Sequence, residues 1–357
     1  FLSDLDGGGA QRTVINLINQ LNKKHIPCSL VVARSDGPAR SWLDNNDNLI
    51  DLGVKRTHLA FFKLRRILIE KKPDLFFSTM VDANILSYFC VFSLKERPKL
   101  VLRETNSHRA RQDIKYLRRK FVGFAYRFAD AIISLSSGVS AELIEDYNLT
   151  PLNVTTIGNP VDVKKIVELS YKLRLSNLSN TDDIPTVIAI GRLTKQKGFD
   201  VLIEAFSMLN QPAKLVILGE GPDRKLLIDL AAKLNISDQL FLPGFVLSPS
   251  NWLVHADVFV LSSRWEGFGH VIIEAMASGV PVIVTDCPHG PRDIIQNGFN
   301  GLLVKMNDPI SISSAIDYLL CNENESDDLK SNAYISMMDF DIDVITNKYI
   351  DLFNRLL

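Results

Sequence analysis

Short apolar runs alternate with amphipathic, helix-length stretches along this chain, and this alternation restricts its fold more than any other feature. In the first half, buried parallel strands are expected at residues 28–33, 75–78, 100–102 and 131–135. Helical patterns separate them, at residues 10–21, 59–71, 85–94, 116–129 and 138–147. Strands that alternate with helices predict a parallel sheet with helices on both of its faces.

The second half repeats this scheme and therefore predicts a second α/β domain. Its strand candidates are residues 185–190, 215–218, 240–242, 258–261, 280–284 and 301–304, and its helix candidates are residues 199–208, 223–234, 271–277 and 309–320. A length of 357 residues suits two domains of ordinary size. We expect two Rossmann-like, doubly wound domains that face a central cleft, because ligands of open α/β sheets bind in such crevices.

A polar stretch ahead of the strand expected at 185–190 marks the boundary between the two domains. We place the first domain at residues 1–170, the linker at 171–183 and the second domain at 184–340. The helical segment 341–357 is expected to pack back on the first domain. Only a remnant of the first strand precedes the first helix, so we expect that strand to be truncated.

The charge distribution differs between the two halves. Residues 1–165 contain 25 Lys and Arg against 17 Asp and Glu, whereas residues 166–357 contain 15 against 24. A basic first half indicates an anionic partner, such as a membrane surface or a phosphorylated acceptor, although chance scatter of charges gives the same picture. Nucleic-acid binding is disfavoured, because the second half is acidic and no recognised nucleic-acid module is present.

The four cysteines lie far apart, without a Cys-x-x-Cys spacing. This pattern predicts reduced thiols in a cytoplasmic protein and no metal site. No uninterrupted apolar run approaches the roughly 18 residues that a membrane-spanning helix needs. We therefore do not expect a transmembrane segment.

Two carboxylates, Glu266 and Glu274, flank a glycine-containing turn at residues 267–269, between the strand expected at 258–261 and an apolar helix. Backbone N–H groups and the positive end of the helix dipole are expected between them. This arrangement suits a phosphorylated, polyhydroxylated ligand, with N–H groups for anionic oxygens and carboxylates for hydroxyls. The alternative is a surface Glu beside a Glu that the helix dipole stabilises.

Two cations, Arg192 and Lys197, follow the strand expected at 187–190 and precede a helix that begins near Asp200. Arg can engage two oxygens at once and Lys acts as a point charge, so the pair can clamp a diphosphate at the helix N-terminus. The alternative is a solvated basic loop.

Three other turns give weaker signals. Gly8 and Gly9 belong to a glycine-rich turn that lets a ligand approach the backbone, but they lack the Gly-x-Gly-x-x-Gly order of a dinucleotide site. Gly219 begins a turn after the strand at 215–218, and Phe245 and Val246 follow another strand, where they can meet a nucleotide base. Ordinary tight turns explain the glycine turns equally well.

The order of these turns, with Asn159-Pro160-Val161-Asp162 between the first two, closely resembles family 4 of the retaining glycosyltransferases, which have the GT-B fold. The resemblance covers essentially the whole chain. Its most specific part is the Glu266-x7-Glu274 block together with Arg192 and Lys197.

The resemblance implies a role for each candidate. Arg192 and Lys197 match the pair that binds the donor diphosphate and stabilises the leaving group. Glu274 matches the carboxylate that holds the ribose, and Glu266 matches the one near the donor sugar. The donor-binding candidates are Gly8, Gly9, Gly191, Arg192, Lys197, Gly219, Phe245, Val246, Glu266, Gly267, Phe268, Gly269 and Glu274; the catalytic candidates are Arg192, Lys197, Glu266 and His108.

His108 is the least secure of these. Family members often carry a His after a strand of the first domain, near the donor sugar. Here that position falls nearer Thr105, and His108 comes three residues later. Glu104 and Asn106 are the alternatives for the role of that His.

The resemblance implies a metal-independent retaining glycosyltransferase with no cofactor. Its substrate is a nucleoside-diphosphate sugar, with UDP favoured as the nucleotide, and it transfers a hexose or N-acetylhexosamine. Residues 287–295 resemble a variant common in members that build bacterial lipid-linked saccharides, so we expect a lipid-linked or saccharide acceptor in surface glycan synthesis, such as lipopolysaccharide or capsule. The alternatives are a sugar-nucleotide epimerase of the same fold and a non-catalytic sugar-nucleotide-binding subunit. A glycosidase would leave Arg192 and Lys197 without a role.

Residues 103–127 are rich in Arg and Lys, with aromatic residues between them. Such a helix can lie on an anionic membrane or grip a lipid diphosphate. This pattern predicts peripheral attachment to the cytoplasmic face of the inner membrane. The alternative is a solvated helix face whose apolar side belongs to the core.

Overall fold

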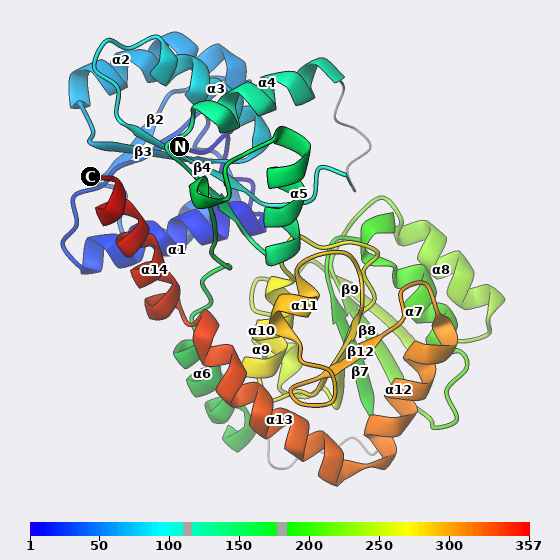
Figure 1. The fold of residues 1–357 in the computed structure, drawn as a ribbon. Coiled ribbons are helices and arrows are strands. Elements are labelled where there is room, and N and C mark those ends of the chain that lie inside the picture. Colours follow the sequence, from blue (N-terminus) through cyan, green and yellow to red (C-terminus); the bar gives the residue numbers. More distant parts are fainter. Residues whose placement is uncertain (110–115, 177–183) are drawn as a thin grey trace. The chain divides into compact units, whose positions relative to one another are not determined.

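The computed structural model describes residues 1–109, 116–176 and 184–357. These residues form two compact units (Figure 1). Unit 1 contains Phe1–Pro160 and Ile342–Leu357, and unit 2 contains Val161–Asp341. Each unit is an α/β structure with parallel strands, which confirms the predicted fold class.

The strands of unit 1 form two parallel sheets. The larger sheet contains β3 (Leu75–Thr79), β4 (Lys99–Glu104), β5 (Ala131–Ser134) and β6 (Val154–Thr156), in that order, and β1 (Leu30–Val32) pairs with β2 (Leu49–Asp51). Leu2 forms a parallel bridge with Val32 of β1, and the nitrogen of Phe1 donates to the carbonyl oxygen of Phe77 in β3 at 2.6 Å. The first two residues therefore lie between β1 and β3.

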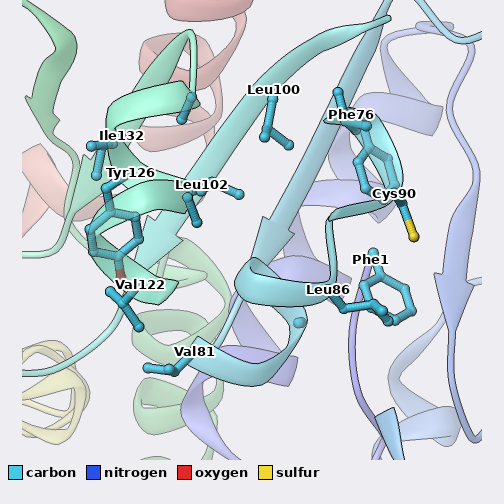
Figure 2. Close-up of a cluster of buried hydrophobic side chains, with 14 of the residues drawn as sticks. Phe1, Phe76, Val81, Leu86, Cys90, Leu100, Leu102, Val122, Tyr126 and Ile132 are labelled. Carbon is cyan, nitrogen blue, oxygen red and sulfur yellow. The ribbon is translucent and has the colours of Figure 1, made fainter. Parts of the chain in front are cut away.

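Helices cover both faces of the larger sheet. Leu100 and Leu102 of β4 point into a core with side chains of α2 (Phe61–Lys71), α3 (Val81–Phe92), α4 (Tyr116–Phe128) and α5 (Ser137–Tyr147) (Figure 2). Val101, between them, packs with α1 (Gly9–Lys23) and α14 (Ile342–Leu356) on the opposite face. Successive strand residues thus enter different cores, which explains the continuous apolar run that predicted this strand.

Unit 2 has one six-stranded parallel sheet in the order β12-β11-β10-β7-β8-β9. The strands are β7 (Thr186–Ile190), β8 (Lys214–Leu218), β9 (Leu240–Gly244), β10 (Val258–Leu261), β11 (Val282–Thr285) and β12 (Leu302–Val304). The strand order reverses between β7 and β10, and ligands of doubly wound sheets bind beyond the carboxyl ends of the strands at such a switch point.

Eight helices belong to the described part of unit 2. They are α6 (Val163–Ser176), α7 (Phe199–Phe206), α8 (Arg224–Lys233), α9 (Ser250–Leu253), α10 (His270–Ala277), α11 (Pro291–Ile294), α12 (Pro309–Cys321) and α13 (Glu323–Met337). Side chains of α7, α8 and α12 share one core with strand residues such as Val187 and Val260. Helix α10 lies beside α6 and α13. In the described residues of both units, no helix is at once long and apolar enough to cross a membrane.

The expected domain boundary at residue 170 differs from the structure. Helix α6 belongs to unit 2, where Arg174 donates to the carbonyl oxygens of Ser278 and Gly279 at the end of α10. The expected linker 171–183 is therefore helical up to Ser176, and its remainder, residues 177–183, lies outside the described residues. In unit 1, α14 places Tyr349 in the core beside α1.

Candidate functional site

Two loops meet at the switch point of unit 2, and each carries one of the predicted charged residues. The loop after β7 continues into a short 3₁₀ turn, η4 (Lys195–Lys197), and the loop after β10 leads to the start of α10. Nζ of Lys197 donates to Oε1 of Glu266 at 2.5 Å, although the two residues lie 69 positions apart in the sequence. The structure thus brings together a cation and a carboxylate that the sequence placed on separate turns.

Glu266 is 7% exposed and is held from a second side. Oγ of Ser263 donates to the same carboxylate oxygen at 2.6 Å. The hydroxyl of Thr285, at the end of β11, donates in turn to the carbonyl oxygen of Ser263 at 2.6 Å. A buried carboxylate with two fixed donors is held in one orientation, which is what a ligand-contacting group needs.

The backbone between Glu266 and α10 forms the predicted helix N-terminus. Gly269 precedes α10 with φ +95°, a conformation that favours glycine, and Gly267 and Phe268 before it are buried. Glu274, the fifth residue of α10, is also buried, and its Oε1 lies 3.5 Å from Nε2 of His270. The N-terminal N–H groups of a helix with adjacent carboxylates can hold anionic oxygens and hydroxyls together.

Glycines keep the neighbouring loops close to one another. A Cβ on Gly191 would lie 2.9 Å from Cε of Lys197, so the stem of Lys197 crosses directly over this glycine. A Cβ on Gly219 would lie only 1.9 Å from the carbonyl oxygen of Gly191, and Gly219 has φ +147°. Close approach of β7 and β8 beyond their carboxyl ends requires Gly219, and the Lys197 stem packs against Gly191, so a structural role is enough to explain both glycines.

The other predicted donor-binding residues belong to three further segments of the two units. The Arg192 side chain is exposed on the β7 loop, and Phe245, 61% exposed, follows β9 together with Val246. In unit 1, Gly8 precedes α1, and its N–H donates to Oε1 of Gln11 at 3.2 Å. A Cβ on Gly9 would meet no atom within 4 Å, so the surface at this residue is open.

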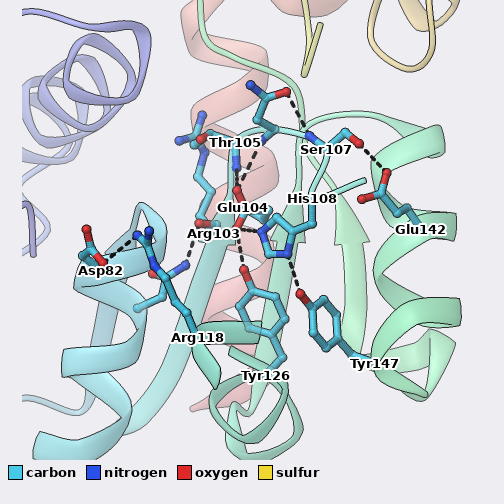
Figure 3. A network of polar contacts seen from close by, with 12 residues as sticks. Asp82, Arg103, Glu104, Thr105, Ser107, His108, Arg118, Tyr126, Glu142 and Tyr147 are labelled. Atoms are coloured by element: carbon cyan, nitrogen blue, oxygen red, sulfur yellow. Dashed lines mark hydrogen bonds and ion pairs between the residues drawn. The ribbon is translucent and has the colours of Figure 1, made fainter. Parts of the chain in front are cut away.

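His108 lies in a buried polar network of unit 1 (Figure 3). Its Nε2 lies 2.7 Å from Oε2 of Glu104, and its Nδ1 lies 2.6 Å from the hydroxyl of Tyr147. The hydroxyl of Tyr126 donates to the same oxygen of Glu104. Burial raises the pKa of Glu104, but the nearby His108 and the hydrogen bonds outweigh this effect and leave that pKa below its usual value.

In this position His108 is bound within unit 1, and its catalytic role stays a prediction. The residue is 4% exposed, and both of its ring nitrogens are engaged within unit 1. The network instead anchors the loop after β4, because Glu104 also accepts from the N–H of Thr105 at 2.8 Å. Sequence reasoning missed the two tyrosines, which come from α4 and α5 and carry no local motif.

The basic segment 103–127 is only partly a charged surface. Arg118 donates to Asp82 and Arg119 donates to Asp146, each at 2.6 Å, so these two cations are paired. Tyr126 is buried, whereas Phe121 and Phe124 are exposed on α4. Residues 110–115 of this segment lie outside the described residues.

Comparison with known proteins accounts for both units. Residues 7–165 match the model of Glycosyltransferase Family 4, and residues 171–336 match the model of Glycosyl transferases group 1. The chain belongs to the family 4 glycosyltransferases. The predicted family and the predicted enzyme class are both confirmed.

Two relatives, one archaeal and one bacterial, are similar to this glycosyltransferase in sequence. It is 33% identical over 279 residues to an uncharacterized glycosyltransferase of Methanocaldococcus jannaschii, and this match covers 74% of the chain and 64% of the relative. The chain therefore spans less than two thirds of the length of that relative. It is 26% identical over 365 residues to the N-acetylgalactosamine-N,N'-diacetylbacillosaminyl-diphospho-undecaprenol 4-alpha-N-acetylgalactosaminyltransferase of Campylobacter jejuni, covering 96% of the chain and 94% of that enzyme.

Solved structures support the same fold. The crystal structure of Anabaena HepE in complex with UDP-glucose matches this glycosyltransferase with a TM-score of 0.82 and 19% identity, over 99% of each chain. At this identity the likeness establishes the fold alone, which is GT-B.

Proposed function

We propose that this glycosyltransferase transfers a hexose or an N-acetylhexosamine from a UDP-sugar to a lipid-linked or saccharide acceptor in bacterial surface glycan synthesis. We further propose that it retains the anomeric configuration and needs neither a metal ion nor a cofactor. The observation that carries the proposal is the contact between Lys197 and Glu266 at the switch point of unit 2, beside the N-terminus of α10.

The proposed chemistry follows from these charges. The bond between the anomeric carbon and the diphosphate oxygen breaks, and negative charge develops on the leaving diphosphate. Lys197, Arg192 and the N–H groups at the start of α10 stabilise that charge, since preorganised donors and cations act where charge develops. The acceptor hydroxyl forms the new bond from the face that the diphosphate leaves, and its proton passes to the departing phosphate oxygen.

The proposed substrates rest on the names of similar proteins. The Campylobacter relative is named for an undecaprenyl diphosphate-linked acceptor and for transfer of N-acetylgalactosamine. The Anabaena structure contains UDP-glucose. Both compounds combine a diphosphate with a sugar, which is the chemistry that the Lys197 and α10 region can bind.

We also propose that unit 1 contacts an anionic membrane surface. Helices α2, α3 and α4 are neighbours in unit 1 (Figure 1). They carry exposed phenylalanines: Phe62 on α2, Phe89 and Phe92 on α3, and Phe121 and Phe124 on α4. Exposed cations accompany them, including Lys63 and Arg66 on α2 and Lys120 on α4. Exposed aromatics next to Lys and Arg favour the interface of a bilayer that contains anionic lipids.

A donor panel tests the proposed reaction. The purified protein is incubated with EDTA and UDP-, GDP- or ADP-sugars, with and without undecaprenyl diphosphate-linked saccharide, and nucleoside diphosphate release is measured. Release from a UDP-sugar that depends on the acceptor supports the proposal, and the anomeric configuration of the product is then read by NMR. Turnover that EDTA abolishes would contradict metal independence, and conversion of the donor sugar without an acceptor would indicate an epimerase.

Vesicle binding tests the membrane proposal separately. A variant with Phe62→Ser, Phe92→Ser and Phe124→Ser is expected to lose most of its co-sedimentation with vesicles that contain phosphatidylglycerol. The control is Leu152→Ser, because Leu152 is 92% exposed but lies outside these three helices. Equal binding by the triple variant and the control would contradict the proposed surface.

A further inference from the structure

Arg264 lies next to the candidate site and binds three separate segments of unit 2. Its NH1 and NH2 donate to the two carboxylate oxygens of Asp200, at 2.9 and 2.7 Å, in the first turn of α7. NH1 also donates to the carbonyl oxygen of Lys195 in η4 at 2.8 Å, and Nε donates to Oδ1 of Asn307 at 2.7 Å. The Arg264 side chain is 17% exposed and that of Asp200 is 38% exposed, so this ion pair is partly shielded from water.

The backbones on either side of Arg264 are bound to the same turn. The N–H of Arg264 donates to the carbonyl oxygen of Gln196 at 2.7 Å, and Nε2 of Gln196 donates back to the carbonyl oxygen of Trp265 at 2.9 Å. Oγ of Ser262 donates to the carbonyl oxygen of Lys197 at 2.8 Å. A Cβ on Gly198 would lie 2.2 Å from the carbonyl oxygen of Ser262, so the two loops are in direct backbone contact.

These contacts surround the backbone of Lys197. The Arg264 side chain itself binds Lys195, Asp200 and Asn307, and not Lys197 or Glu266. The guanidinium bonds to Lys195 and Asp200 fix the turn before Lys197 and the helix after it. Because Lys197 has a long flexible stem, the position of its backbone decides where its charge can reach.

We propose that Arg264, through Asp200, is a positioning residue that holds Lys197 where the donor diphosphate binds. This proposal rests on the proposed function, in which Lys197 contacts that diphosphate. A lysine at position 264 keeps the positive charge but cannot make the paired bonds to Asp200 together with those to Lys195 and Asn307. Arg264→Lys therefore loosens the turn without removing charge from the site.

The test combines substitutions of the positioning residue and of the residue on which it acts. UDP affinity is measured by calorimetry, and donor turnover by diphosphate release, for Arg264→Lys, Lys197→Ala and the double variant. Arg264→Lys is expected to weaken UDP binding about 10-fold and to lower kcat about 10- to 100-fold, since small misplacement of a catalytic group has effects of that size. The control is Arg355→Lys, which alters an exposed Arg in the last turn of α14 in unit 1.

The double variant decides between a positioning role and an independent one. If Arg264 acts through Lys197, the double variant binds UDP and turns over donor within about 2-fold of Lys197→Ala alone. Multiplied losses in the double variant, or a loss of UDP binding in Arg264→Lys when Lys197→Ala binds normally, would overturn the inference.

Amide hydrogen exchange in the protein without nucleotide separates this inference from the proposed function. Residues 195–198 are expected to exchange faster in Arg264→Lys than in the parent and in Arg355→Lys, whether or not any donor is turned over. Unchanged exchange at this turn would overturn the positioning role even in an active enzyme. Faster exchange combined with no UDP binding by the parent would leave positioning supported and remove the proposed donor.

Discussion

Lys197 already has an anionic partner, and this contact defines what a donor must replace. Its ammonium group lies 2.5 Å from Glu266, which also accepts from Ser263. A diphosphate that binds Lys197 competes with this carboxylate, whereas a sugar hydroxyl can donate to Glu266 as Lys197 moves toward the phosphate. In the proposed donor complex we therefore expect the pair to exchange one set of charged contacts for another, which limits the cost of uncovering either charge.

Glu274→Gln is the residue-scale prediction for nucleotide binding. We expect the substitution to weaken UDP binding about 10- to 100-fold, because a hydrogen bond to a charged group contributes about 1.5–3 kcal/mol. The difference in affinity between UDP and 2′-deoxy-UDP should also become smaller, since Glu274 is predicted to hold the ribose. Glu325→Gln, an exposed Glu on α13, serves as the control. Unchanged affinity for UDP in Glu274→Gln would remove the ribose assignment.

We predict that Glu104→Gln changes how the stability of the fold depends on acidic pH. The pKa of Glu104 is lower in the folded protein than in the unfolded chain, so the carboxylate stabilises the fold above its unfolded pKa, near 4.5, and this contribution is lost as pH falls through the lower folded pKa. The unfolding free energy of the parent should therefore fall more steeply below about pH 4.5 than that of Glu104→Gln. Chemical denaturation between pH 7 and pH 3 measures both slopes. If the unfolding free energies of the two proteins fall in parallel with pH, Glu104 does not contribute to the acid sensitivity of the fold.

Local sequence predicted the charged residues of the site better than their surroundings. Lys197 and Glu266 follow strands and belong to turns, so their chemistry was visible in the sequence. The positioning role proposed for Arg264 was not recognised, because it depends on a contact with Asp200, which is 64 positions away in the sequence. The burial of His108 was missed for a related reason: it depends on Tyr126 and Tyr147, and no spacing in the sequence links those residues.

At the scale of elements, the apolar strands were predicted, including β3, β9 and β12 at the edges of their sheets, whereas β2 and β6 were not. β4, β7 and β10 are buried on both faces and read as apolar runs. β2 and β6 have three residues each and are partly or fully exposed, so their composition resembles that of loops. Helix α13 was also missed, because its buried positions include Ser326 and Ala333 and most of its other residues are polar.

Gly219→Ala is the element-scale prediction. A Cβ at this position would lie 1.9 Å from the carbonyl oxygen of Gly191, and φ of +147° is unfavourable for alanine, so β7 and β8 would have to separate beyond their carboxyl ends. We expect a loss of about 1–3 kcal/mol in the unfolding free energy of unit 2, measured by urea denaturation. Gly9→Ala is the matched control, because its Cβ would meet nothing within 4 Å. Equal stability of the two variants would contradict the close approach.

At the scale of the whole molecule, unit 1 is built from two segments of the chain that are separated in the sequence by all of unit 2. Unit 1 contains the first 160 residues and also α14, which follows all of unit 2 in the sequence. Ile345, Tyr349 and Leu352 of α14 complete a core with Leu17 of α1 and Val101 of β4. The sequence predicted that this helix returns to the first domain but placed the boundary ten residues too late, since α6 carries no signal for the unit to which it belongs.

Removal of α14 is therefore expected to destabilise unit 1 selectively. A chain that ends at Asp341 should lose the calorimetric transition of unit 1 and bind the dye ANS, while unit 2 keeps a transition that UDP raises. Tyr349→Ala provides a milder variant, with an expected loss of about 3–5 kcal/mol for a buried aromatic residue. If the shortened chain keeps both transitions, the core between α1 and α14 contributes little to the stability of unit 1.

The position of α14 also has a consequence for synthesis on the ribosome. Domains generally fold as units, and N-terminal domains usually fold first. Here unit 2 is complete once residue 341 has emerged, whereas unit 1, although synthesised earlier, waits for its last helix. Until then Leu17, Val101 and Ile133 form an uncovered apolar face on the nascent chain. Unit 1, which is synthesised first, is thus expected to reach its native state last. It is the unit whose exposed apolar face a chaperone would need to bind.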